Sequence, residues 1–198
     1  MFSFAIAVFL MLITPGPGVL STAGVGTAYG MRAGISYVTG LFLGSNLVGL
    51  LVISGLAAIM LDIPFIRIAL AVLSAGYLTY LAAKIAFSGT RIAIINPTAP
   101  PAIFAGIMLQ LINPKAYAVN TTFFSGFVVY PDAFLTETII KLLILNGIWI
   151  PVHIGWLYAG HRLRSLDISA RAQRRINMVM AICLLGVVVL SLVSILGY

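Results

Sequence analysis

Two proline-containing breaks interrupt apolar stretches of this chain at equivalent places in its two halves. The first stretch is interrupted at Thr14-Pro15-Gly16-Pro17, and a later one at Asn113-Pro114-Lys115-Ala116. Proline removes a backbone hydrogen bond from a helix and clashes with the preceding turn, so we expect both stretches to be broken helices. Pro15 and Pro114 lie half the length of the 198-residue chain apart. This pairing favours a fold made of two similar halves, each with a break.

The composition indicates a chain embedded in a membrane. It is 62% hydrophobic and 8% charged, with a mean hydropathy of +1.15, whereas a soluble domain carries about 25% charged residues. A membrane-spanning helix needs roughly 20 apolar residues. The sequence therefore predicts an all-α integral membrane protein with six transmembrane helices. Their expected ranges are 2–24, 36–61, 65–86, 102–126, 136–160 and 176–197.

An irregular segment divides this single transmembrane domain of residues 1–198 into two halves. Residues 91–101 include a run rich in prolines and turn formers and are expected to be a linker. They separate a first repeat, about 1–90, from a second, about 102–198. Three spans per half is an odd number, so two similar halves have to cross the membrane in opposite directions. The predicted architecture is a 3+3 inverted repeat in which helices 1 and 4 are broken.

Basic residues gather in alternate predicted loops and set the expected orientation. The positive-inside rule places these loops in the cytoplasm of a bacterial-type inner membrane. The net charge of +7 is then explained by a basic rim facing anionic membrane lipids, and no nucleic-acid partner is expected. The residues concerned are Arg32, Lys84, Arg91, Arg162, Arg164, Arg171, Arg174 and Arg175.

The two breaks are the expected substrate site. Unwound backbone at membrane depth is tolerated only where it is buried in protein or lines a wet cavity, and paired breaks point to the binding site of a transporter. The amide end of a broken helix suits a carboxylate and the carbonyl end suits an ammonium group, so an amino-acid-like small molecule fits. Capping of the half-helices by Thr14 and Asn113 is the structural alternative. The expected substrate-binding residues here are Thr14, Pro15, Gly16, Pro17, Asn113, Pro114 and Lys115.

Four polar side chains within the predicted spans are candidates for a functional role. Lys115 is expected to contact the substrate carboxylate, and the alternative is that it snorkels to an interface. Asn46 and Asn146 are further substrate-binding candidates, with an interhelical hydrogen bond as the alternative. His153 changes charge near physiological pH and is a candidate for proton coupling, against a simple hydrogen bond to a neighbouring helix.

The acidic residues narrow the substrate class. Asp62, Asp132, Glu137 and Asp167 all fall near predicted helix ends or in loops, so no carboxylate is expected at the membrane centre. A carboxylate proton relay is therefore not visible in the sequence. Strongly cationic substrates are disfavoured, and neutral amino acids or other small carboxylate-bearing metabolites are favoured.

The sequence offers little for an enzyme. It contains no Gly-x-Ser-x-Gly, His-Glu-x-x-His or phosphate-binding loop, and two histidines with one cysteine cannot form a conventional zinc site. We expect no catalytic residues, cofactor or metal. The competing hypothesis is a membrane scaffold or assembly subunit without transport activity of its own. Transport would require Lys115 and the asparagines to converge on one cavity between the breaks.

Both proline motifs resemble the signature elements of the lysine exporter / threonine–homoserine efflux (LysE/RhtB-type) family. The glycines at 30, 34, 40 and 44 and the stretch Gly76-Tyr77-Leu78-x-Tyr80-Leu81 are also similar, and the resemblance covers nearly the whole chain. It implies an inner-membrane exporter of amino acids and related metabolites, generally an antiporter driven by the proton motive force. Glycine-rich helix faces are compatible with a homo-oligomer. Family members often carry an aspartate directly after Pro-Gly-Pro; here that position is Gly18, so the role of that carboxylate is not transferred.

Overall fold

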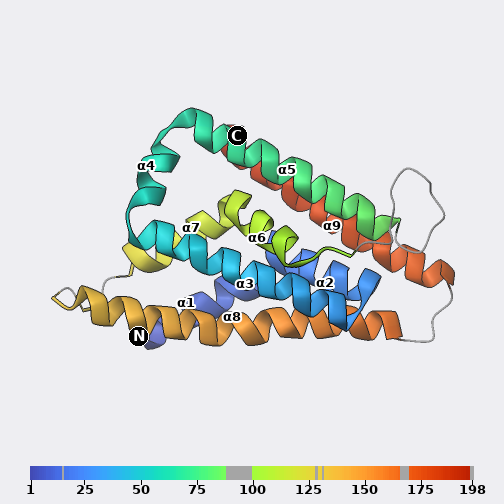
Figure 1. The fold of residues 1–198 in the computed structure, drawn as a ribbon, viewed down its shortest axis with the longest axis horizontal. Coiled ribbons are helices and arrows are strands. Elements are labelled where there is room, and N and C mark those ends of the chain that lie inside the picture. Colours follow the sequence, from blue (N-terminus) through green and yellow to red (C-terminus); the bar gives the residue numbers. More distant parts are fainter. Residues whose placement is uncertain (15, 88–99, 128, 131, 166–169, 197–198) are drawn as a thin grey trace.

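The structure is a computed structural model, and it describes residues 1–198 except 15, 88–99, 128, 131, 166–169 and 197–198. The described residues form helices and connecting turns, with no strand among them (Figure 1). The helices are α1 (Phe2–Ile13), α2 (Pro17–Tyr29), α3 (Met31–Ile53), α4 (Leu56–Asp62), α5 (Pro64–Ala86), α6 (Ile103–Ile112), α7 (Pro114–Ser125), α8 (Phe134–Ser165) and α9 (Ala170–Leu196).

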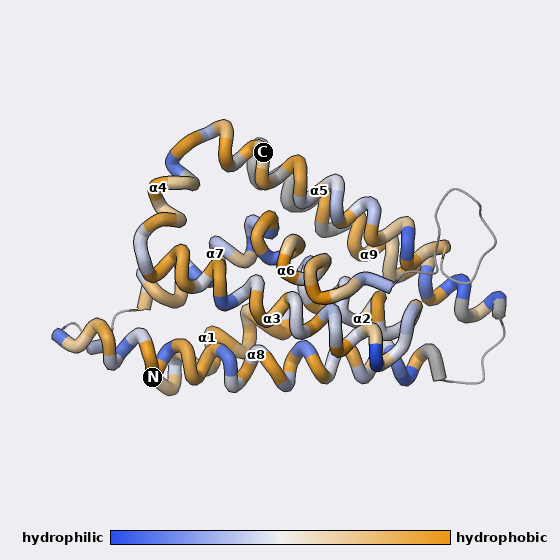
Figure 2. The backbone as a smooth tube through the Cα atoms, in the orientation of Figure 1, coloured by the Kyte–Doolittle hydropathy of each residue, from blue (hydrophilic) through white to orange (hydrophobic). Residues whose placement is uncertain are grey.

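Several of these helices are suited to a membrane. Within the described part of the chain, α3, α5 and α8 are each long and apolar enough to cross a bilayer. The pair α1 and α2, bent by 50° at its break, makes a fourth if it is taken as one span. Hydrophobic residues run along most of the helices (Figure 2). The predicted all-α, multi-pass membrane class is confirmed at this level, and the count of six spans in an inverted repeat stays a prediction.

The helix breaks lie where the prolines predicted them, at 14–16 and at Asn113. Pro15 itself, like most of the predicted linker, lies outside the described residues. The predicted helix over 36–61 is wrong as a single element, because α3 ends at Ile53 and α4 begins at Leu56. Gly55 between them has φ 77°, in the left-handed region that glycine adopts at little cost.

The other helix boundaries differ from the predicted spans by a few residues. The first broken span continues to Tyr29, and α8 and α9 extend beyond the predicted 136–160 and 176–197 toward the basic segment. Charged residues are compatible with these helix ends because long basic side chains reach the interface from within a helix. The start of α3, the end of α5, the end of α8 and the start of α9 lie at one end of the bundle (Figure 1), so the basic residues of these segments gather there.

Each half packs along the broken helix of the other half. α3 lies against α6 and α7, α8 lies against α2 and α1, and α5 pairs with α9. Small residues permit this close approach. A Cβ added at Gly40 would lie 1.9 Å from the Ile103 carbonyl oxygen, and one at Gly160 would lie 2.1 Å from the Ala23 carbonyl oxygen. Gly40 and Gly160 therefore let helices of the two halves approach closely within the chain.

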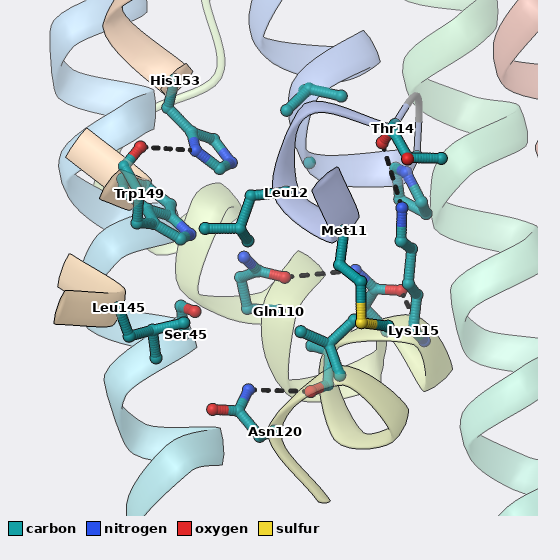
Figure 3. Close-up of a pocket in the computed structure, with 17 residues that line it drawn as sticks. Met11, Leu12, Thr14, Ser45, Gln110, Lys115, Asn120, Leu145, Trp149 and His153 are labelled. Carbon is teal, nitrogen blue, oxygen red and sulfur yellow. Dashed lines mark hydrogen bonds between the residues drawn. The ribbon is translucent and has the colours of Figure 1, made fainter. Parts of the chain in front are cut away.

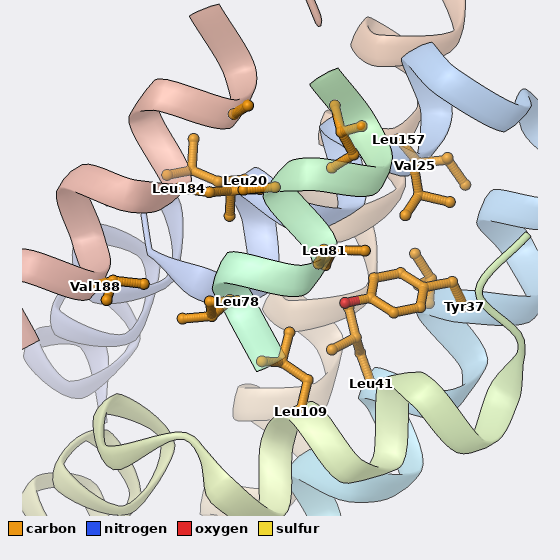
Figure 4. Packing of buried hydrophobic residues seen from close by; sticks show 14 of the residues in the cluster. Leu20, Val25, Tyr37, Leu41, Leu78, Leu81, Leu109, Leu157, Leu184 and Val188 are labelled. Atoms are coloured by element: carbon orange, nitrogen blue, oxygen red, sulfur yellow. The ribbon is translucent and has the colours of Figure 1, made fainter. Parts of the chain in front are cut away.

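An apolar core fills the space between α2, α3, α5, α8 and α9 (Figure 4). Leu81 and Leu157 are almost fully buried in it, and Tyr37 packs among them. Close packing of this kind leaves little freedom for the backbone. The core holds α2 and α8 in fixed positions on one side of the two breaks.

Gly160→Ala is expected to lower the free energy of unfolding by about 1–3 kcal/mol, because the new methyl group overlaps the backbone of α2. Gly155→Ala, on the same helix, is the matched control, since nothing lies within 4 Å of its added Cβ. Thermal unfolding of both variants in detergent measures the difference. Equal melting temperatures would contradict the close α2–α8 contact.

Candidate functional site

A cavity of about 60 Å³ lies between the two helix breaks (Figure 3). It is lined by the end of α1, the start of α2, the end of α6 and the start of α7, with α3 and α8 completing the wall. This space is large enough for a few water molecules. The predicted residues Thr14, Gly16, Pro17, Asn113 and Lys115 all line it. His153 lines it as well.

At the first break, Thr14 does not cap the following half-helix. Its Oγ1 donates a hydrogen bond to the Leu10 carbonyl oxygen at 2.6 Å, so it closes α1, and the capping alternative for Thr14 is wrong. The N-cap of α2 is Gly16, which has no side chain to offer. The first amides of a helix have no partner within the helix. This end of α2 therefore presents uncapped amides beside the cavity.

At the second break, Asn113 does cap its half-helix. Its Oδ1 accepts a hydrogen bond from the Lys115 backbone N–H at 3.1 Å, and its Nδ2 donates to Gln110 Oε1 at 3.1 Å. Pro114 occupies the first position of α7, where a missing N–H costs nothing. The two breaks therefore differ. The Asn113 side chain accepts a hydrogen bond from an amide at the start of α7, whereas no side chain caps the start of α2.

Lys115 connects the two breaks. Its Nζ donates a hydrogen bond to the Thr14 carbonyl oxygen at 3.1 Å. A Cβ at Gly16 would lie 2.8 Å from Lys115 Nζ and 2.9 Å from its Cδ, so the side chain passes directly over Gly16. In Figure 3 the Lys115 side chain extends toward Thr14. The side chain points across the protein to the first break.

His153 is held rigidly against the wall of the cavity. It is 3% exposed, and its ring stacks on Trp149 with centroids 3.6 Å apart and an interplanar angle of 11°. Its Nδ1 lies 2.9 Å from the Trp149 carbonyl oxygen. The hydrogen bond is therefore within α8, in contrast to the interhelical bond considered from the sequence. A role in proton coupling stays a prediction.

Asn46 and Asn146 meet across the two halves. Each Nδ2 donates to the other's Oδ1, at 3.1 Å and 2.9 Å, and joins α3 to α8. Neither belongs to the lining of the cavity described above. Pro114 also lies outside that lining. The structure places the pair as an interhelical clamp, and binding of substrate by these asparagines stays a prediction.

Acidic side chains are absent from the described lining of the cavity. Glu137 lies in the first turn of α8, where its Oε1 is 2.5 Å from Lys141 Nζ and its Oε2 accepts from the Val129 backbone N–H at 3.0 Å. This buried pair holds the α7–α8 connection onto α8. No group of three or more metal-ligating side chains occurs in the part of the chain that the structure describes.

Four polar or aromatic lining residues are not among the predicted site residues: Ser45, Gln110, Asn120 and Trp149. Helical spacing offers a signal for two of them. Trp149 lies four positions before the predicted site residue His153, so the two share a face of α8. Asn120 lies four positions after Ala116, the last residue of the second proline motif, so these two share a face of α7. Asn120 is 3% exposed, and its Oδ1 has no hydrogen-bond partner among the described residues.

Known proteins resemble this chain over most of its length. The family model described as LysE type translocator matches residues 9–196. The leucine efflux protein of Salmonella typhimurium is 30% identical over 168 residues, covering 75% of this chain and 79% of that protein. The cysteine/O-acetylserine efflux protein of Salmonella typhi is 30% identical over 173 residues, covering 87% of each chain. No solved structure matches this chain.

Replacing either Asn46 or Asn146 with leucine is expected to lower the free energy of unfolding by about 1–2 kcal/mol, because the remaining amide loses its partner. The double replacement is expected to cost less than the sum of the two, since no unpaired amide is left. Thermal unfolding of the three variants in detergent forms the double-mutant cycle. Strict additivity would show that the two amides are not coupled.

Proposed function

The chain belongs to the LysE type translocator family, whose members are amino-acid efflux transporters and not enzymes, and from this premise we propose a specific activity. The protein is a secondary active exporter of small neutral amino acids or related carboxylate-bearing metabolites. Relatives named for efflux of leucine and of cysteine or O-acetylserine support a neutral substrate. The absence of a carboxylate from the described lining of the cavity supports the same choice.

The observation that carries the proposal is the position of Lys115. Its ammonium group lies over Gly16, beside the uncapped start of α2. A helix N-terminus attracts anions through its free amides and its dipole, and an ammonium group adds a charge-assisted hydrogen bond. A substrate carboxylate at this point replaces the Thr14 carbonyl oxygen as the partner of Lys115.

The proposed architecture is the inverted repeat of six spans. In it, α1 and α2 correspond to α6 and α7, α3 corresponds to α8, and α5 corresponds to α9. The reciprocal packing of α3 and α8 on the broken helices of the opposite halves supports this correspondence, and so does the mutual Asn46–Asn146 pair. Movement of the halves around the cavity would supply alternating access. A cavity of about 60 Å³ has to widen for a whole amino acid to bind.

Orientation and energy source complete the proposal. The basic helix ends at one end of the bundle are assigned to the cytoplasm of the inner membrane by the positive-inside rule, and export is driven by the proton motive force. His153, buried against the cavity, is the proposed proton-coupling residue. Lys115 and Asn113 line the cavity between the breaks, whereas Asn46 and Asn146 do not, so the convergence expected of a transporter is partial. Membership of a family of efflux transporters favours transport over the scaffold alternative.

Lys115→Ala is expected to reduce leucine efflux about tenfold or more, because a charged hydrogen bond to the substrate contributes about 1.5–3 kcal/mol. Efflux of labelled leucine from preloaded proteoliposomes with an imposed pH gradient measures this. Lys115→Arg is the matched control and is expected to retain most of the activity, since it keeps the charge. Efflux by Lys115→Ala equal to that of the unmodified protein would contradict the assigned site.

Gly16→Ala is expected to impair efflux to a similar degree without removing a charge. The added methyl group would lie 2.8 Å from Lys115 Nζ and displaces that side chain from the start of α2. The same proteoliposome assay applies, with thermal unfolding in detergent to show that the variant is folded. Unchanged efflux would mean that Lys115 does not act from over Gly16.

A further inference from the structure

The cavity has to accommodate an α-ammonium group without a carboxylate to balance it, since no acidic residue is present in its described lining. We propose that Nε2 of His153 is the acceptor for the substrate's α-ammonium group, and that Gly18 leaves the space in which this group sits. The inference rests on the proposed function. It assigns His153 a direct contact with substrate, and Gly18 a role in specificity.

The hydrogen bond of His153 defines which of its nitrogens can accept. A backbone carbonyl oxygen only accepts, so the 2.9 Å contact between Nδ1 and the Trp149 carbonyl requires that Nδ1 carry the proton. In the neutral ring, Nε2 is then an acceptor with a free lone pair. The stacked Trp149 ring fixes the plane of the imidazole, so the lone pair has one direction.

His153 Nε2 borders the space above Gly18. A Cβ at Gly18 would lie 3.4 Å from His153 Nε2, which is the nearest atom to it, and 3.9 Å from Gln110 Nε2. The carbonyl of Gly18 is already used, because it accepts from Ser21 Oγ and Thr22 Oγ1. A small donor group above Gly18 therefore finds His153 Nε2 as its partner.

The residues beside this space suit the carboxylate of an amino acid. Gly16 faces Lys115 and Gly18 faces His153, so a cation and a neutral acceptor flank the start of α2 two residues apart. In an α-amino acid the carboxylate and the ammonium group are attached to the same carbon and need adjacent partners of opposite kind. Gln110 Oε1 already accepts a hydrogen bond from Asn113, so His153 Nε2 is the acceptor that faces the space above Gly18.

The experiment compares two probes that differ only in the ammonium group. Leucine and 4-methylpentanoate share a carbon skeleton and a carboxylate, and their dissociation constants are measured by titration of the full chain in detergent. His153→Phe is expected to weaken leucine binding about tenfold or more, the loss expected for one hydrogen bond to a charged group. Binding of 4-methylpentanoate is expected to change less than about twofold, since it makes no such bond.

Two further variants make the result specific. Gly18→Ala places a methyl group at ordinary van der Waals distance from Nε2, so it is expected to fold normally and to show the same leucine-selective loss. His153→Gln supplies an amide oxygen as acceptor and is expected to restore part of the leucine affinity. Melting temperatures close to that of the unmodified protein exclude a general loss of structure.

The outcomes separate this inference from the proposed function. Equal weakening of both probes by His153→Phe, or no weakening of either, overturns the ammonium contact while the Lys115 site stands. Lys115→Met is expected to weaken both probes, and a failure to do so contradicts the carboxylate site of the proposed function. Leucine-selective loss in both His153→Phe and Gly18→Ala supports the inference.

Discussion

The structure depends on the need to satisfy backbone polar groups inside a membrane. Each helix break frees amides and carbonyls, and such groups in the hydrocarbon region need partners within the protein or in a wet cavity. At the second break Asn113 satisfies the start of α7, whereas at the first break Thr14 closes α1 and leaves the start of α2 uncapped. The uncapped amides at the start of α2 give a positive potential next to Lys115. An anionic ligand group is the natural partner for it.

Close packing between the halves makes these two breaks meet. α3 and α8 each lie along the broken helix of the opposite half, and the absence of side chains at Gly40 and Gly160 lets backbones touch. The same arrangement brings Asn46 to Asn146 and His153 to Gly18. The site is therefore a product of contacts between the halves, and neither half contains it alone.

Much of the fold was predictable because its causes are local. The prolines at the breaks and the apolar runs identified a helical membrane protein with interrupted helices, and Lys115 was identified as a basic residue within an apolar span. The prediction for 36–61 failed at Gly55, since a single glycine in an apolar run does not reveal its φ of 77°. Trp149 and Asn120 were missed, although each lies one helical turn from a residue of the predicted site or its motif.

The sequence by itself determined the class of the protein and the two places where prolines break its helices, and motifs spread along the chain indicated its family. The class and the proline breaks follow from properties that act over a few residues: the missing N–H of proline, the length of an apolar run and the charge of a side chain. The tertiary structure alone decided that Lys115 reaches Thr14, that Asn46 and Asn146 bind each other, and that His153 faces Gly18. These contacts join residues about a hundred or more positions apart. Such contacts depend on how closely two helices approach, and that distance is set by packing across the whole bundle.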